Sequence, residues 1–247
     1  LSHNLGFPRI GDRRQLKFAL EAYWQGKSDQ ETLFSVAKAV KEANWRAEAK
    51  LDFLTAGDFS FYDHILDTST LLGVIPPRFD QDENADVSLD TYFRIARGQA
   101  PTGKETYASE MTKWFDTNYH YIVPEIEKGQ RFRIASQKLF DEVKEAVRFS
   151  ETLAKEAQST QSAKPVKAVI VGPVTWLYLA KVKGLAEGES FDKLTLLPEL
   201  LATYGEILTE LNHLGAAFIQ IDEPILVLDL AQAWQDALLT AYEALAK

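Results

Sequence analysis

Cysteine is absent from this sequence of 247 residues. No disulfide can form within it, no thiolate nucleophile is available, and no zinc site with a cysteine ligand can be assembled from these residues alone. The absence agrees with a cytoplasmic location, where thiols stay reduced. We therefore look for function among carboxylates, basic side chains and aromatic rings.

Basic residues are also in the minority, since 27 Lys and Arg face 36 Asp and Glu and give a formal net charge of −9. Binding to nucleic acid depends on clustered positive charge, so we expect no nucleic-acid partner. No apolar run reaches the roughly 18 residues of a membrane-spanning helix, and no signal-peptide pattern opens the chain. Because numbering starts at Leu1 rather than at Met, we expect a trimmed segment of a longer protein.

Two stretches, 166–171 and 218–221, are apolar without alternation, which is typical of strands in a parallel sheet covered by helices. Further strands are predicted at 5–10, 51–56 and 119–123, and a small separate hairpin strand at 131–135. Helices are predicted to begin at Asp12 and at Ser28, each as the N-cap of a capping box. In the first of these, Leu16, Leu20 and Tyr23 form a buried face. Other helices are predicted at 63–72, 90–97, 107–115, 137–158, 197–214 and 231–246, with a polar loop at 158–164.

This alternation of strands and helices predicts an α/β fold with a parallel sheet, either a barrel or an open doubly wound sheet. No G-x-G-x-x-G follows a strand, which disfavours a dinucleotide-binding fold. A closed (β/α)8 barrel needs eight strands, and about five main strands are predicted. We therefore expect roughly the first five βα units of a TIM-type barrel, with one incomplete domain over 1–247.

The carboxyl ends of the predicted strands carry mostly acidic groups. Asp58, Asp63 and Asp222, together with His64 and His120, could form a carboxylate–histidine metal site. Their spacing matches no metal motif, so the alternative is a polar barrel mouth of hydrogen-bonded side chains.

A basic stretch at residues 9–17 leaves the first predicted strand and enters a helix N-terminus, where free N–H groups and the helix dipole favour anions. Arg14 and Lys17 lie three residues apart on one side of that helix. Lys113, in the predicted helix 107–115, is a third cation. If these three side chains converge, they would bind a ligand with several carboxylates. The alternative is that they belong to a solvated basic helix face.

The run 114–121 (WFDTNYHY) is rich in aromatic residues. Its rings could stack on a planar ligand such as a pterin, or they could belong to the core. Composition alone favours the core.

Five strings now resemble one family in order along the chain: LGFPRIG at 5–11, GDFSFYDH at 57–64, MTKWFDTNYHY at 111–121, GPVTWL at 172–177 and QIDEP at 220–224. They look like the N-terminal barrel of the cobalamin-independent methionine synthases. That family transfers the methyl group of 5-methyltetrahydropteroyltriglutamate to homocysteine, and its C-terminal barrel holds a catalytic zinc.

The resemblance implies that this chain helps to bind the polyglutamyl folate and takes no part in the zinc chemistry. Carried over by motif, the tail-binding residues are Arg14, Gln15, Leu16, Lys17 and Lys113, and no residue here is catalytic or a metal ligand. Glu is common in the family where this chain has Gln15, which puts a side-chain role there in doubt. Asp222 and Glu223 echo a catalytic motif of the second barrel, but we interpret them here as structural groups.

Two other functions stay open at this stage. One is a freestanding folate-binding module without catalysis, and the other is a metal-dependent lyase or hydrolase barrel built on the Asp and His residues named above. On the family's logic we expect the chain alone to lack methyltransferase activity, because zinc and homocysteine belong to the other barrel.

Overall fold

The structure, a computed structural model, describes residues 1–156 and 163–246. Most of the polar loop predicted at 158–164 therefore lies outside the described residues. The chain divides into two compact units, each assembled from three segments, and the units are described one at a time. Unit 1 comprises Leu1–Phe61, Lys138–Ile170 and Glu210–Gln220; unit 2 comprises Tyr62–Gln137, Val171–Thr209 and Ile221–Lys247.

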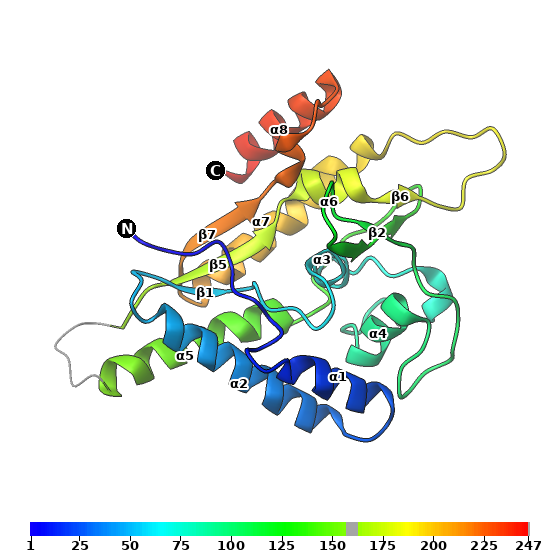
Figure 1. Ribbon diagram of the computed structural model, residues 1–247. Coiled ribbons are helices and arrows are strands. Elements are labelled where there is room, and N and C mark those ends of the chain that lie inside the picture. Colours follow the sequence, from blue (N-terminus) through cyan, green and yellow to red (C-terminus); the bar gives the residue numbers. More distant parts are fainter. Residues whose placement is uncertain (157–162, 247) are drawn as a thin grey trace. The chain divides into compact units, whose positions relative to one another are not determined.

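Unit 1 is built on a three-stranded sheet in the order β1-β5-β7, formed by β1 (Leu54–Ala56), β5 (Val166–Val171) and β7 (Ala216–Asp222) (Figure 1). The last residues of β5 and β7 are assigned to unit 2. β1 and β5 run parallel, with Leu54 opposite Val166. All six residues of β5 are buried. Five of the six are apolar, as expected for a strand covered on both faces, and the buried Lys167 donates from its Nζ to Gln220 Oε1 at 2.6 Å.

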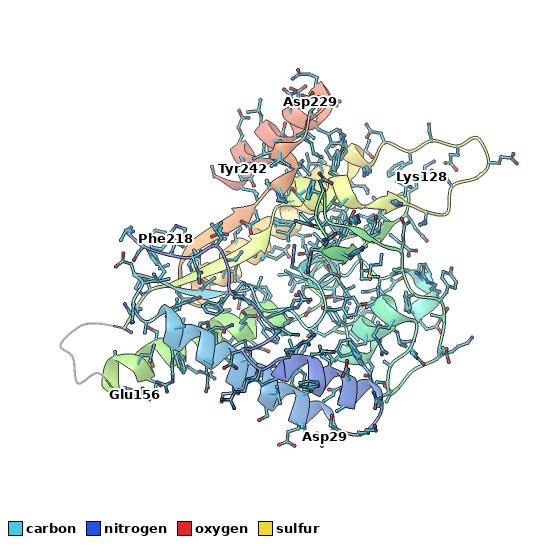
Figure 2. All side chains as sticks on the ribbon, viewed as in Figure 1. Asp29, Lys128, Glu156, Phe218, Asp229 and Tyr242 are labelled. Atoms are coloured by element: carbon cyan, nitrogen blue, oxygen red, sulfur yellow. The ribbon has the colours of Figure 1, made fainter. Side chains whose placement is uncertain are left out.

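Three helices complete unit 1: α1 (Gln15–Trp24), α2 (Gln30–Glu48) and α5 (Lys138–Glu156). α2 packs against α1, α5 and β1, and Figure 1 shows α2 and α5 side by side. Its inward stripe holds Leu33, Ala37 and Val40, at the spacing of one helical face. On β7, Phe218 (labelled in Figure 2) is half exposed, and its ring meets that of Phe53 edge to face at 4.6 Å.

Unit 2 contains most of the remaining elements. Its helices are α3 (His64–Leu71), α4 (Leu89–Arg97), α6 (Pro173–Leu179), α7 (Leu197–His213, whose last residues are assigned to unit 1) and α8 (Gln232–Leu245), with 3-10 turns η1 (Pro77–Phe79), η2 (Lys193–Leu196) and η3 (Pro224–Val227). An antiparallel hairpin joins β2 (Met111–Lys113) to β3 (His120–Ile122), and β4 (Glu125–Ile126) pairs in parallel with β6 (Lys181–Val182). Within the core the fully buried Trp176 donates its Nε1–H to Ser69 Oγ at 3.0 Å.

The long periodic segments confirm their predictions. The strands at 166–171 and 218–221 are present as β5 and β7, and the strand at 51–56 is present in shorter form as β1. The expectation that helices cover both faces is wrong for β7, in which one of the seven residues, Ala216, is buried. Helices predicted at 63–72, 90–97, 197–214 and 231–246 correspond to α3, α4, α7 and α8. The described part of 137–158 is α5.

The strand predicted at 5–10 is wrong, because this segment forms no strand. Its backbone groups bond to side chains instead of to a neighbouring strand. The N–H of Phe7 donates to Asp58 Oδ2 at 2.6 Å, and the carbonyl of Leu5 accepts from Gln220 Nε2 at 3.1 Å. Pro8 has no N–H to offer.

Both predicted N-caps are displaced towards the C-terminus. α1 begins at Gln15 after Arg14, not after Asp12, and α2 is capped by Asp29 instead of Ser28. The Asp29 carboxylate accepts the N–H of Thr32, which is the bond that an N-cap side chain makes.

The helix predicted at 107–115 is also wrong, since its end forms strand β2. The strand at 119–123 exists as β3 but pairs with β2 in the hairpin, outside the three-stranded sheet. No strand forms at 131–135, where the N–H groups of Arg133 and Ala135 donate to the last carbonyls of α3 and its C-cap.

The described residues therefore form a mixed α/β structure that does not close into a barrel. The main sheet has three strands where five were expected, because two of the five predicted segments do not join it. None of the helices described at 1–156 and 163–246 is long and apolar enough to cross a membrane.

Candidate functional site

The basic segment in unit 1 forms a tight loop that leads into α1. Arg14 adopts the left-handed conformation, with φ of 61°, and donates its N–H to the carbonyl of Gly11 at 3.1 Å. This conformation is uncommon for a residue with a Cβ. It makes Arg14 the residue before the helix, so the prediction that Arg14 and Lys17 share a helical face is wrong. Both side chains nevertheless reach the surface.

Gln15 closes this loop with its side chain. Its Nε2 donates to Asp12 Oδ1 at 2.8 Å, and its Oε1 accepts the N–H of Arg13 at 3.0 Å. The donation lowers the pKa of Asp12. A glutamate at this position could not donate to Asp12, so the amide has a local structural role that a carboxylate would not fill.

Leu16 belongs to the core, with a side chain that is 0% exposed. Its N–H donates to the carbonyl of Ile10 at 3.2 Å, so neither its side chain nor its N–H is available to a ligand. The buried face predicted for this helix is confirmed, because Leu20 and Tyr23 are buried as well.

Lys17 lies in the first turn of α1 with a partly exposed side chain. Its Nζ is 3.6 Å from Glu21 Oε1, an exposed ion pair four residues apart. Such exposed pairs contribute little to stability. The ammonium of Lys17 adds positive charge near the N-terminal end of α1, where the helix dipole is positive as well.

A cavity of about 550 Å³ lies beside this loop within unit 1. It is bounded by Asp12 and Gln15 on the loop and by small and apolar side chains of α2. The lining residues are Phe7, Pro8, Gly11, Asp12, Gln15, Val36, Ala39, Val40, Ala43, Asn44 and Ala47. The loop therefore presents exposed cations next to a mostly apolar hollow.

Lys113 lies in unit 2 at the end of β2, and its side chain is exposed. The hairpin register places it directly opposite His120. Because strand side chains alternate between faces, Lys113 and His120 project from one face, whereas Trp114 and Tyr121 project from the other.

The aromatic side of the hairpin forms a cluster with α3. The ring of Trp114 meets those of His64 and Tyr121 edge to face, with centroids at 4.8 and 5.8 Å. His64 stacks on Tyr119, with centroids at 5.5 Å and planes 6° apart. Tyr121 is buried while the other three rings are partly exposed, so the cluster is both core and surface.

Asp63 joins this cluster to the start of α3. One carboxylate oxygen accepts the N–H groups of Ile65 and Leu66, and the other accepts the N–H of Ile122 at 3.0 Å. Burial raises the pKa of Asp63 to about 7, against the opposing effect of these three donors.

Other carboxylates after strands have similar structural roles. Glu223 in unit 2 accepts the N–H groups of Val174 and Thr175 at the start of α6, as well as the hydroxyl of Tyr242 on α8 (labelled in Figure 2). Burial raises the pKa of Glu223. Asp58 in unit 1 accepts the N–H of Phe7. Burial, with nearby Glu142 adding to it, raises the pKa of Asp58.

Glu142 is a buried group that the sequence analysis missed. Its Oε1 accepts the N–H of Gly57 at 2.7 Å, directly after β1. The available signal was a glutamate next to Val143 in the apolar stripe of a long helix, since charged residues are seldom buried without a partner.

These donors do not fit a metal ion. Among residues 1–156 and 163–246, no group of three or more His, Cys, Asp or Glu side chains could hold one. The carboxylate oxygens of Asp63 and Glu223 accept backbone N–H groups instead of facing open space. The interpretation of Glu223 as a structural group agrees with these contacts.

The five expected binding residues therefore fall into two places. Arg14, directly before α1, and Gln15, Leu16 and Lys17, in its first turn, lie together in unit 1, and Lys113 lies on the hairpin of unit 2. The structure brings the first four together, with Leu16 turned into the core. The meeting of Lys17 with Lys113 stays a prediction.

Comparison with known proteins covers the whole chain. Residues 1–247 match a family described as the N-terminal domain of cobalamin-independent synthase. Three curated relatives, from Salmonella enteritidis, Salmonella paratyphi B and Salmonella schwarzengrund, are each named 5-methyltetrahydropteroyltriglutamate–homocysteine methyltransferase and are 49% identical over 248 aligned positions. The alignments cover 100% of this chain and 30% of each relative, so the chain spans about 30% of their length. The chain belongs to the family of the cobalamin-independent synthase N-terminal domain.

Proposed function

We propose that this chain is part of a cobalamin-independent methionine synthase, a methyltransferase of methionine biosynthesis that acts on 5-methyltetrahydropteroyltriglutamate and homocysteine. Within that enzyme it contributes to binding the glutamate tail of the folate. The observation that carries the proposal is the match over all 247 residues together with exposed cations in the loop before α1. The relatives' name supplies the substrates.

The residues that we propose for tail binding are Arg14, Gln15 and Lys17, at the start of α1 in unit 1, and Lys113, on the hairpin of unit 2. Leu16 fixes the start of α1 from within the core. A triglutamate tail carries several carboxylates, and the cations and the first turn of α1 present complementary charge. Exposed pairs are weak one by one, so affinity should grow with the number of glutamates.

Methyl transfer to homocysteine needs its sulfur as a thiolate, which zinc provides in the C-terminal part of the full enzyme on our proposal. The described residues of this chain do not fit that ion. We therefore propose that this chain is part of a TIM-type barrel that binds folate and leaves the chemistry to another domain. The cytosol suits this enzyme because the substrate thiol stays reduced there.

Calorimetric titration with mono- and triglutamyl 5-methyltetrahydrofolate tests the binding role. The triglutamate should bind more tightly, and Lys17→Ala and Lys113→Ala should each weaken it by about 2- to 5-fold while leaving the monoglutamate nearly unchanged. Lys38→Ala is the matched control, because Lys38 also pairs with a glutamate four residues on. Equal affinity for the two ligands would refute the tail site.

An activity assay tests whether this chain alone can transfer the methyl group. The purified chain, given zinc, homocysteine and the triglutamyl folate, should form no methionine. Turnover above the uncatalysed rate would contradict the assignment of the chemistry to another domain.

A further inference from the structure

The face of the β2–β3 hairpin opposite the aromatic cluster carries an unbalanced pair of basic side chains. Lys113 and His120 are direct cross-strand partners, so their Cβ atoms are roughly 4.5–5.5 Å apart. Both side chains are exposed. Among the described residues, neither forms an ion pair with a carboxylate.

This arrangement lets one anion reach both side chains. The Lys113 ammonium is positively charged, and the His120 ring lies directly opposite it on the neighbouring strand, so an anion between them would contact side chains from both strands. Two other exposed lysines of unit 2 have carboxylate partners: Lys128 pairs with Glu189 at 2.9 Å and Lys181 with Glu110 at 2.6 Å. The Lys113 ammonium faces solvent instead.

The orientation of the His120 ring is set by the hairpin itself. Its Nδ1 is 2.9 Å from the carbonyl oxygen of Asn118. A carbonyl only accepts hydrogen bonds, so Nδ1 carries the proton and Nε2 is the nitrogen left for other partners. A carboxylate accepts a hydrogen bond from Nε2 when that atom carries a proton too.

Hydrogen bonds hold the backbone of the hairpin on both sides of His120. The N–H of Trp114 donates to the carbonyl of Tyr119 at 2.7 Å, which closes the ladder next to the pair. Further along, Asp63 holds the N–H of Ile122. Binding an anion here therefore needs little reordering of the backbone.

We propose that His120 is a further contact for the glutamate tail, binding a carboxylate through Nε2 beside Lys113. The inference rests on the proposed function, since it assigns a further specificity-determining residue to the same site. Lys113 supplies a mobile point charge, whereas the imidazole supplies a fixed direction.

The test is calorimetric titration of the full 247-residue chain with mono- and triglutamyl 5-methyltetrahydrofolate. His120→Gln, which keeps a polar side chain without the charge, should weaken the triglutamate by about 2- to 5-fold and leave the monoglutamate unchanged. His120→Arg should retain triglutamate affinity. His213→Gln is the control, because His213 is an exposed histidine on α7.

A second readout separates binding from a structural role. In the ¹⁵N NMR spectrum of the His120 ring, the triglutamate should shift both nitrogens towards the imidazolium values and the monoglutamate should not. If Lys113→Ala weakens the triglutamate while His120→Gln does not, the tail site stands and His120 is not part of it. Equal losses for both ligands in His120→Gln, or no ring response, overturn the inference as well. If neither Lys17→Ala nor Lys113→Ala weakens triglutamate binding, the proposed function itself is refuted, and the inference about His120 is refuted with it.

Discussion

Gly57 allows the backbone conformation that the chain adopts directly after β1. Its φ is +88°, and a Cβ there would overlap the carbonyl oxygen of Val169 and lie 2.9 Å from Leu139 Cδ1. Gly57→Ala should therefore lower the free energy of unfolding by about 2–3 kcal/mol, as measured by urea denaturation. A smaller cost would mean that the backbone here relaxes easily.

Gly129 is the matched control for this substitution. It also has a positive φ, of +77°, but a Cβ would meet nothing within 4 Å. Gly129→Ala should cost only about 1 kcal/mol, the penalty of the left-handed conformation alone. If the two alanine variants were equally stable, steric overlap at Gly57 would not be the cause.

The burial of single side chains could be predicted where the spacing of apolar residues indicates one face of a helix. Leu16, Leu20 and Tyr23 follow helical spacing and are buried. The bond between Gln15 and Asp12 was not predictable as such, because the Asp-x-x-Gln spacing is equally typical of a capping box. In the structure Arg14 adopts the left-handed conformation and precedes α1, so the helix begins after Asp12 and Asp12 is not its N-cap.

At the scale of the elements, the carboxylate of Asp63 connects the start of α3 to strand β3. Asp63→Asn keeps an acceptor for the start of α3 but places an amide nitrogen against the N–H of Ile122. The variant should lose about 1–3 kcal/mol of stability in chemical denaturation. Its hairpin amides should also exchange faster with solvent.

Asp29→Asn is the control at the element scale. Asp29 caps α2 through the N–H of Thr32 alone, so asparagine can replace it at a cost below about 0.5 kcal/mol. Equal losses in the two variants would indicate a simple capping effect at Asp63 and no link to β3.

Two segments show why pairing is hard to predict from local patterns. A strand was predicted at 119–123 and is present as β3, but its partner β2 was predicted as part of a helix; each strand is three residues long, so the hairpin depends on pairing between its strands more than on local preference. Residues 5–10 look like a strand by composition, but their hydrogen bonds go to Asp58 and Gln220, about 50 and 215 positions away. No local pattern records such partners.

At the scale of the whole molecule, the same limit applies to the tail site. The resemblance to the family's motifs assigned residues 14–17 and Lys113 to the proposed tail site, and the structure buries the Leu16 side chain in the core. The pairing of Lys113 with His120 depends on strand register, which residue types alone do not state.

Buried carboxylates should also govern how the stability of the whole chain depends on pH. Burial raises the pKa of Asp63 to about 7 and raises the pKa values of Asp58, Glu48 and Glu223. The folded state therefore holds protons that the unfolded state releases above about pH 4. The free energy of unfolding should fall as the pH rises from 5 to 7.5, on the order of 1–3 kcal/mol.

The exposed carboxylates act in the opposite direction at lower pH. The pKa of Asp29 is lowered by the N–H of Thr32, and that of Asp52 by the N–H of Ser2, so their contribution is lost as the pH falls below 4. Urea denaturation should therefore find a stability maximum near pH 5. Asp63→Asn should flatten the decline towards pH 7.5, because the amide does not titrate, and its deficit relative to the parent chain should be larger at pH 5 than at pH 7.5. A parent chain that gains stability between pH 5 and 7.5 would show that backbone N–H donors outweigh burial at these carboxylates.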